Sequence, residues 1–78
     1  MLKIINIIID GTLLSCMILI ECDPGKAYRL VLDTTKDFYP VVDSEIPEDE
    51  KMYERQARMA LFQYHGKEFP ETITSAWY

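Results

Sequence analysis

Few side chains in this sequence are of the kinds that do chemistry near neutral pH. There is one histidine, His65, and there are two cysteines, Cys16 and Cys22. Imidazole has an ordinary pKa near neutrality, and thiols act as nucleophiles or metal ligands once they are deprotonated. His65 stands directly before Gly66, a position typical of a helix end, where the helix dipole favours a cation. One imidazole and two thiols are too few ligands for a structural zinc ion, so the sequence predicts no metal and no cofactor.

The spacing of the two cysteines predicts free thiols. Six residues along one strand separate their Cα atoms by about 20 Å, whereas a disulfide needs Cα atoms within about 7 Å of each other. We expect Cys16 to be the more buried of the two. Free thiols are typical of a reducing compartment, so a cytoplasmic location is predicted.

One short motif could suggest phosphate chemistry. Residues 8–13, Ile-Ile-Asp-Gly-Thr-Leu, resemble the Asp-x-Asp-Gly-Thr motif of haloacid dehalogenase-type phosphatases. In that family the first aspartate is the nucleophile, and Ile8 stands at its position here. The residues Asp10-Gly11 are equally typical of a β-hairpin turn, which is the interpretation we favour. Ser15 and Cys16 fall inside a predicted strand with no predictable base beside them. The sequence therefore predicts no catalytic residue and no enzyme.

The chain is acidic, with 13 Asp and Glu against 8 Lys and Arg and a net charge of −5. This balance argues against direct binding of nucleic acid, which needs Lys and Arg to neutralise phosphates. Eight of the carboxylates lie in residues 33–54: Asp33, Asp37, Asp43, Glu45, Glu48, Asp49, Glu50 and Glu54. They could be a solvated loop with a helix start, which the helix dipole favours, or a face that meets a basic partner.

Three apolar runs predict a sheet. Residues 2–9, 13–21 and 27–33 are rich in apolar and β-branched side chains, and turn signals separate them. Such runs joined by tight turns favour a three-stranded antiparallel meander. In the first run we expect Leu2, Ile4 and Ile8 to share one face. The first two runs are apolar on both faces, so the predicted sheet needs a cover on each side. An aspartate within the apolar N-terminal region disfavours insertion into a membrane.

A helix is predicted over residues 45–65, with Ser44 as N-cap, Pro47 in the first turn and Gly66 after its end. At helical spacing one face should be buried: Ile46, Tyr53, Ala57, Ala60, Leu61 and Tyr64. The opposite face carries Met52, Arg55, Met59 and Phe62. Met and Phe there suit an adaptable contact surface, although the tail could also cover them. We take these four residues as the candidate partner surface.

The remaining segments are expected to be irregular. Residues 34–43 should lie on the sheet edge, with Phe38 and Tyr39 tucked against it. The tail, residues 67–78, ends in Trp77-Tyr78 and is too apolar to be left in solvent. We expect it to dock, either as a loop or as a short fourth strand.

Together these patterns predict one α+β domain over residues 1–78: three antiparallel strands, one helix packed on the sheet and a docked tail. They do not identify a function. We favour a small non-enzymatic cytosolic module that acts by protein–protein contact with a partner of unknown identity. The alternative is an acidic inhibitor or nucleic-acid mimic, of the kind that mobile elements encode, in the basic groove of a partner. Apolar surface on both sheet faces also favours self-association, most simply as a two-fold homodimer.

Overall fold

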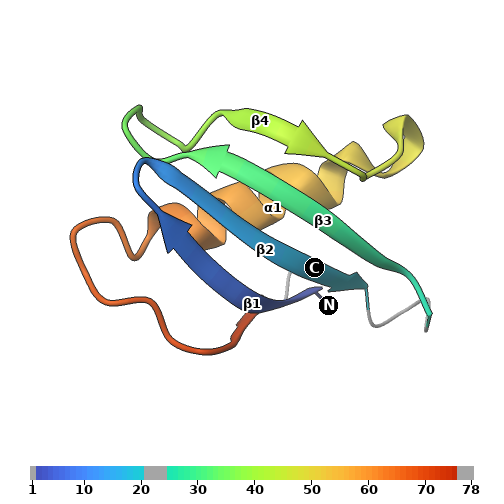
Figure 1. Cartoon of the computed structure of the whole chain (residues 1–78). Coiled ribbons are helices and arrows are strands. Elements are labelled where there is room, and N and C mark those ends of the chain that lie inside the picture. Colours follow the sequence, from blue (N-terminus) through green and yellow to red (C-terminus); the bar gives the residue numbers. More distant parts are fainter. Residues whose placement is uncertain (1, 21–24, 76–78) are drawn as a thin grey trace.

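In the computed structural model the described part of the chain forms a five-stranded antiparallel sheet with one α-helix packed against one of its faces (Figure 1). The structure describes residues 2–20 and 25–75. In chain order the elements are β1 (Leu2–Asp10), β2 (Leu13–Ile20), β3 (Ala27–Asp33), β4 (Val41–Ser44), the short 3₁₀ helix η1 (Glu48–Glu50), α1 (Lys51–Phe62) and β5 (Ile73–Ser75). The strands lie side by side in the order β4-β3-β2-β1-β5.

The predicted meander is confirmed. Each of β1, β2 and β3 pairs with the next one along the chain, and Leu13 lies opposite both Asp10 and Asp33. The Asp-Gly turn joins β1 to β2, and Gly11 has a φ of +63°, a left-handed conformation that costs glycine little. The other predicted turn falls largely on residues 21–24. These residues, which include Cys22, lie outside the described part of the chain.

The sheet has more strands than the sequence predicted. Within the stretch expected to be irregular, β4 pairs with β3, and the tail returns as β5 along the outer edge of β1, where Ile73 lies opposite Ile4. Both added strands hydrogen-bond to edges of the meander that would otherwise be unpaired. With four and three residues, they are too short to show the alternation that identifies a strand.

The helix is shorter than predicted. Helical structure begins with η1 and ends at Phe62, whereas we expected residues 45–65. Ser44 is not an N-cap: it ends β4, and its hydroxyl accepts a hydrogen bond from the Ile46 backbone N–H at 3.1 Å. Pro47 has extended backbone angles, φ −68° and ψ 161°, and a proline steers the preceding residue away from helical geometry. The proline therefore delays the helix start.

The hydrophobic core lies between α1 and one face of the sheet. Of the predicted core face, Ala57, Ala60 and Leu61 are buried on α1 and Tyr53 packs at its margin. Ile46 and Tyr64 also contact the core, but they lie before and after the helix. The sheet contributes Leu2, Ile4, Leu14, Cys16, Ile18, Ile20, Leu30, Leu32 and Ile73.

A β-bulge divides β1 into two halves. Even-numbered side chains face the core before the bulge, and odd-numbered side chains face it after the bulge. Ile5 lies opposite Met17 but Ile8 lies opposite Ser15, so β1 carries one extra residue between them. Asn6 takes a φ of +54°, a left-handed conformation that asparagine tolerates better than most residues. As a result Ile7, not Ile8, packs against the core, and the predicted grouping of Ile8 with Leu2 and Ile4 was wrong.

No helix within the described residues is long and apolar enough to cross a membrane.

Candidate interaction surface

The four residues predicted as a partner surface do not share one environment. Met52 and Met59 are 62% and 51% exposed, and Arg55 is exposed as well. Phe62 is partly buried and packs against the core. Three of the four residues are therefore exposed on the outer side of α1, and Phe62 is partly buried.

Phe62 is covered by the loop between β3 and β4. The Phe38 ring lies 5.0 Å from the Phe62 ring, and the Tyr39 ring meets it edge-on at 5.3 Å. Tyr39 is 2% exposed and belongs to the core. The sequence placed these two aromatic residues on the sheet edge, whereas they lie against the helix because the loop crosses to its C-terminal half.

The loop holds two consecutive residues in an unfavourable conformation. Phe38 and Tyr39 have φ angles of 61° and 48°, in the left-handed region that bulky side chains avoid. Such backbone strain costs about 1–3 kcal/mol per residue and persists where surrounding contacts enforce it. Here Arg58 enforces it, because its Nε donates to the Phe38 carbonyl at 3.2 Å and to the Tyr39 carbonyl at 2.9 Å.

This conformation keeps Phe38 in solvent. Its side chain is 59% exposed although it is large and aromatic, and it lines a hollow of about 190 Å³ with Arg55, Arg58 and Met59. We call these four residues the Phe38 patch. Met52 continues the same stripe of the helix, seven residues before Met59. Among the described residues, neither arginine of the patch forms an ion pair.

Two residues of the patch were missed from the sequence. Arg58 is three residues after Arg55, a spacing that places both on neighbouring parts of a helix surface, and this spacing was the available signal. Phe38 carried no signal, since its approach to the helix depends on the path of the loop.

A second candidate site is a cleft of about 510 Å³ beside the same loop. It is lined by Ile7, Ile9, Thr34, Tyr39, His65, Lys67, Glu68 and Phe69. The Tyr39 hydroxyl lies 3.0 Å from His65 Nδ1, and the imidazole stacks on Phe62 at 5.4 Å. Burial raises the pKa of Tyr39, so the phenol stays protonated at neutral pH and keeps an O–H group that can donate a hydrogen bond.

The chemistry within reach of this cleft is limited. The Tyr39–His65 contact is the one hydrogen bond between ionisable side chains among the described residues that line the cleft. Cys16 lies in the core, where burial raises the pKa of its thiol to about 12, so it is a protonated thiol and a poor nucleophile. In this arrangement the tyrosine–histidine pair ties the loop to the end of α1.

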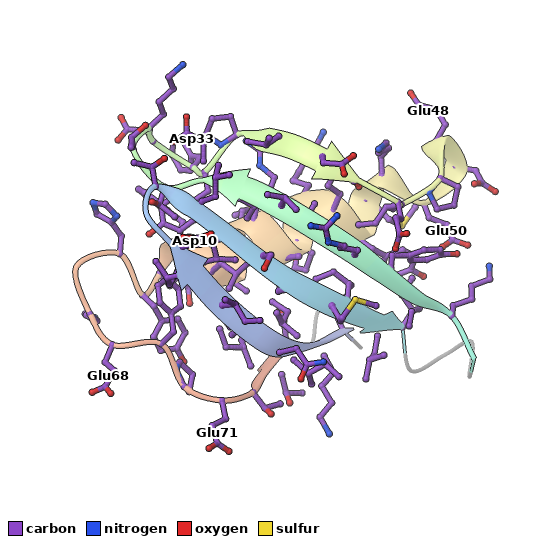
Figure 2. The ribbon with its side chains drawn as sticks, in the orientation of Figure 1. Asp10, Asp33, Glu48, Glu50, Glu68 and Glu71 are labelled. Carbon is purple, nitrogen blue, oxygen red and sulfur yellow. The ribbon has the colours of Figure 1, made fainter. Side chains whose placement is uncertain are left out.

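The acidic residues are dispersed and mostly engaged. Figure 2 shows Asp33 near one end of the sheet and Glu48 and Glu50 near the opposite end. Five of the eight carboxylates in residues 33–54 have partners within the protein, namely Asp33 with Thr35, Asp43 and Glu45 with Arg29, Glu50 with Lys26, and Glu54 with Lys51. The bonds to Thr35 lower the pKa of Asp33.

Within residues 2–20 and 25–75, no cluster of three or more His, Cys, Asp or Glu could hold a metal ion. Comparison with known proteins adds no relative: no family model, no curated protein and no solved structure matches this chain.

Proposed function

We propose that this protein is a small non-enzymatic module that acts by protein–protein contact, and that the Phe38 patch binds the partner. The observation that supports this most is the presentation of Phe38, a large aromatic side chain held in solvent on a left-handed backbone by the Arg58 side chain. Strain of this kind concentrates at functional sites, where it preorganises a contact.

The composition of the patch indicates the chemistry of the partner. Phe38 and Met59 supply an apolar centre, and methionine adapts its shape to different ligands. Arg55 and Arg58 flank this centre without ion-pair partners among the described residues. A guanidinium group pairs best with a carboxylate. The partner segment should therefore carry an apolar side chain flanked by Asp or Glu.

The net charge of −5 does not oppose such a partner at close range. At physiological salt, exposed charges separated by more than about 8 Å are largely screened. Local pairing between the arginines and carboxylates of the partner then determines specificity.

The alternative, an acidic inhibitor or nucleic-acid mimic, has less support. A mimic needs an array of free carboxylates on one face, and most of those in residues 33–54 are engaged by groups of the protein itself. Its binding to a basic groove would fall steeply with added salt. Binding at the Phe38 patch, with two arginines around an apolar centre, would fall less steeply with salt than binding through an array of carboxylates.

The proposal can be tested with a library of random peptides displayed on phage. We expect the selected peptides to combine Asp or Glu with Phe, Leu or Trp. For one selected peptide, fluorescence anisotropy should show that Arg55→Glu raises Kd by about tenfold or more, because it replaces an attraction with a repulsion. Lys67→Glu is the matched control, since it makes the same charge change at an exposed residue outside the patch.

A second variant separates binding from folding. Phe38→Gly removes the ring but suits the left-handed backbone, so relief of the backbone strain offsets the lost contact with Phe62. We expect a Tm close to that of the parent and no measurable peptide binding. Selection of peptides without acidic residues, or equal binding by Arg55→Glu and the parent, would contradict the proposal.

A further inference from the structure

Among the residues that the structure describes, no helix lies on the sheet face that points away from α1 (Figure 1), and many of its side chains are apolar. Within the described residues, α1 and η1 lie on the other face and β5 extends the edge (Figure 1). The apolar side chains on this open face are Ile5, Ile8, Leu13, Met17, Leu19 and Val31. Ile8 and Leu13 are exposed, Ile5, Met17 and Leu19 are half-buried, and Val31 is already buried. Ile8 is 59% exposed because the bulge at Asn6 turns it away from the core.

Strand register arranges the open face in four rows across the sheet. On β1, β2 and β3 the first row is Lys3, Leu19 and Ala27, the second is Ile5, Met17 and Arg29, the third is Ile8, Ser15 and Val31, and the fourth is Asp10, Leu13 and Asp33. Asp43 of β4 lies opposite Val31 and extends the third row. The first two rows carry the cations, and the third and fourth carry the carboxylates. Hydrogen bonds from Thr35 lower the pKa of Asp33, so that carboxylate is charged at neutral pH. The open face is therefore positively charged at one end of its strands and negatively charged at the other.

We propose that the open face binds a second copy of this chain, through a two-fold axis that lies between the two sheets and runs across the strands. This operation stacks the first row of one copy on the fourth row of the other, and the second row on the third. Lys3 then faces Asp10 of the second copy, Leu19 faces Leu13, and Ile5 faces Ile8. Met17 faces the small Ser15, which lines a hollow of about 220 Å³.

Charge and shape are thus self-complementary in this orientation. The other face-to-face arrangement, with the two-fold axis along the strands, would stack Asp10 on Asp33 of the second copy and gather the cations of both copies at one end, which disfavours it. Facing sheets pack about 10 Å apart with their side chains in contact. Arg29, which pairs only loosely with Asp43 at 3.7 Å, faces Val31 of the second copy and lies diagonal to its Asp33.

The size of the face and the protection of the sheet edges support contact between faces. The molecule measures 31 × 22 × 21 Å, so the face presents on the order of 600 Å², close to the ~800 Å² that each partner buries in a standard interface. As far as the described residues go, both edge strands are very short, which is a common protection against pairing edge to edge. The Phe38 patch lies on the helix side, so this inference is independent of the proposed function.

The oligomeric state tests the proposal, measured by light scattering at tens of micromolar protein and physiological salt. We expect a mass twice the 9.1 kDa of one chain. Ile8→Asp should raise the dimer dissociation constant by about tenfold or more, because it places a charge in an apolar contact. The matched control is Met52→Asp, which makes the same change on the exposed side of α1 and should leave the dimer intact.

Reversal of one charge pair tests the orientation. Lys3→Asp should weaken the dimer, and the double variant Lys3→Asp/Asp10→Lys should restore it, since the reversed pair forms again across the two-fold axis. A mass near 9.1 kDa for the parent protein would overturn the proposal. So would a dimer that Ile8→Asp leaves intact, or a failure of Asp10→Lys to rescue Lys3→Asp.

Discussion

Tyr39 combines three roles that its residue type alone would not predict. Its ring is buried against Phe62, its backbone is left-handed, and its hydroxyl meets His65 Nδ1. The buried phenol oxygen needs a hydrogen-bond partner, and the imidazole supplies it from the turn after α1. This one side chain therefore joins the loop that presents Phe38 to the end of the helix.

Removal of the Tyr39 hydroxyl should destabilise the protein modestly. We expect Tyr39→Phe to lower the free energy of unfolding by about 1 kcal/mol, the usual net value of one hydrogen bond, measured by urea unfolding at neutral pH. Tyr64→Phe is the control, because no hydrogen bond to the Tyr64 hydroxyl is found among the described residues. Equal effects of the two substitutions would show that the contact with His65 contributes nothing.

At the scale of elements, α1 depends on a narrow buried face. Ala57 and Leu61 are fully buried and Ala60 nearly so, and small residues at two of these positions let the helix approach the sheet closely. The adjacent Met59 points to solvent. Neighbouring positions on α1 should therefore differ sharply in how much a charged substitution lowers the stability of the protein.

Ala60→Asp should come close to unfolding the protein. It places an unpaired carboxylate in the core, and we expect a loss of about 3 kcal/mol or more, a large share of the stability of so small a domain. Circular dichroism during thermal unfolding measures it. Met59→Asp introduces the same charge one position earlier and should shift Tm by only a few degrees. Comparable melting of the two variants would mean that the helix is rotated relative to the sheet.

The elements that could be predicted are those with a repeating pattern. Residues 27–33 form a strand with the predicted bounds, and helical spacing identified Ala57, Ala60 and Leu61 as buried. The bulge at Asn6 could not be predicted, because a single inserted residue has no periodicity of its own. The strand β4 was missed, and β5 was left as one of two alternatives. Both strands are too short to show an alternation, and their pairing depends on residues far away in the sequence.

The candidate surface was predicted only in part. Met52, Arg55 and Met59 lie in solvent because helix geometry fixes which side chains oppose the core. Helical spacing alone also places Phe62 on the side of the helix away from the core. Its environment differs only because residues 34–40 fold over it. Contributions from a loop of this kind depend on tertiary contacts and have no local sequence signal.

For the whole molecule, the buried thiol predicts how stability varies with pH. The pKa of Cys16 is about 12 in the folded protein against an ordinary 9.0. Above about pH 9 the unfolded chain loses a proton that the folded chain retains. The free energy of unfolding should therefore fall as pH rises, by up to about 1.4 kcal/mol per pH unit.

Urea unfolding from neutral pH to about pH 10 measures this dependence, in a Cys22→Ser background that removes the other thiol. Cys16→Ala in the same background is the control, and we expect its stability to fall less over the same range. Tyr39, whose pKa is also raised by burial, adds to the decrease in both proteins at the upper end. Parallel pH profiles would show that Cys16 ionises equally in the folded and unfolded states.

The position of β5 beside β1 also has a consequence in time. Ile4 pairs with Ile73, which is synthesised 69 positions later, and at 5–20 residues per second this takes roughly 3–14 s. During that interval the outer edge of β1 has no strand to pair with. The run from Leu2 to Ile9 is rich in isoleucine and carries a single charged residue, Lys3. Each nascent chain therefore passes through a period in which one lysine is the main protection of this edge against aggregation.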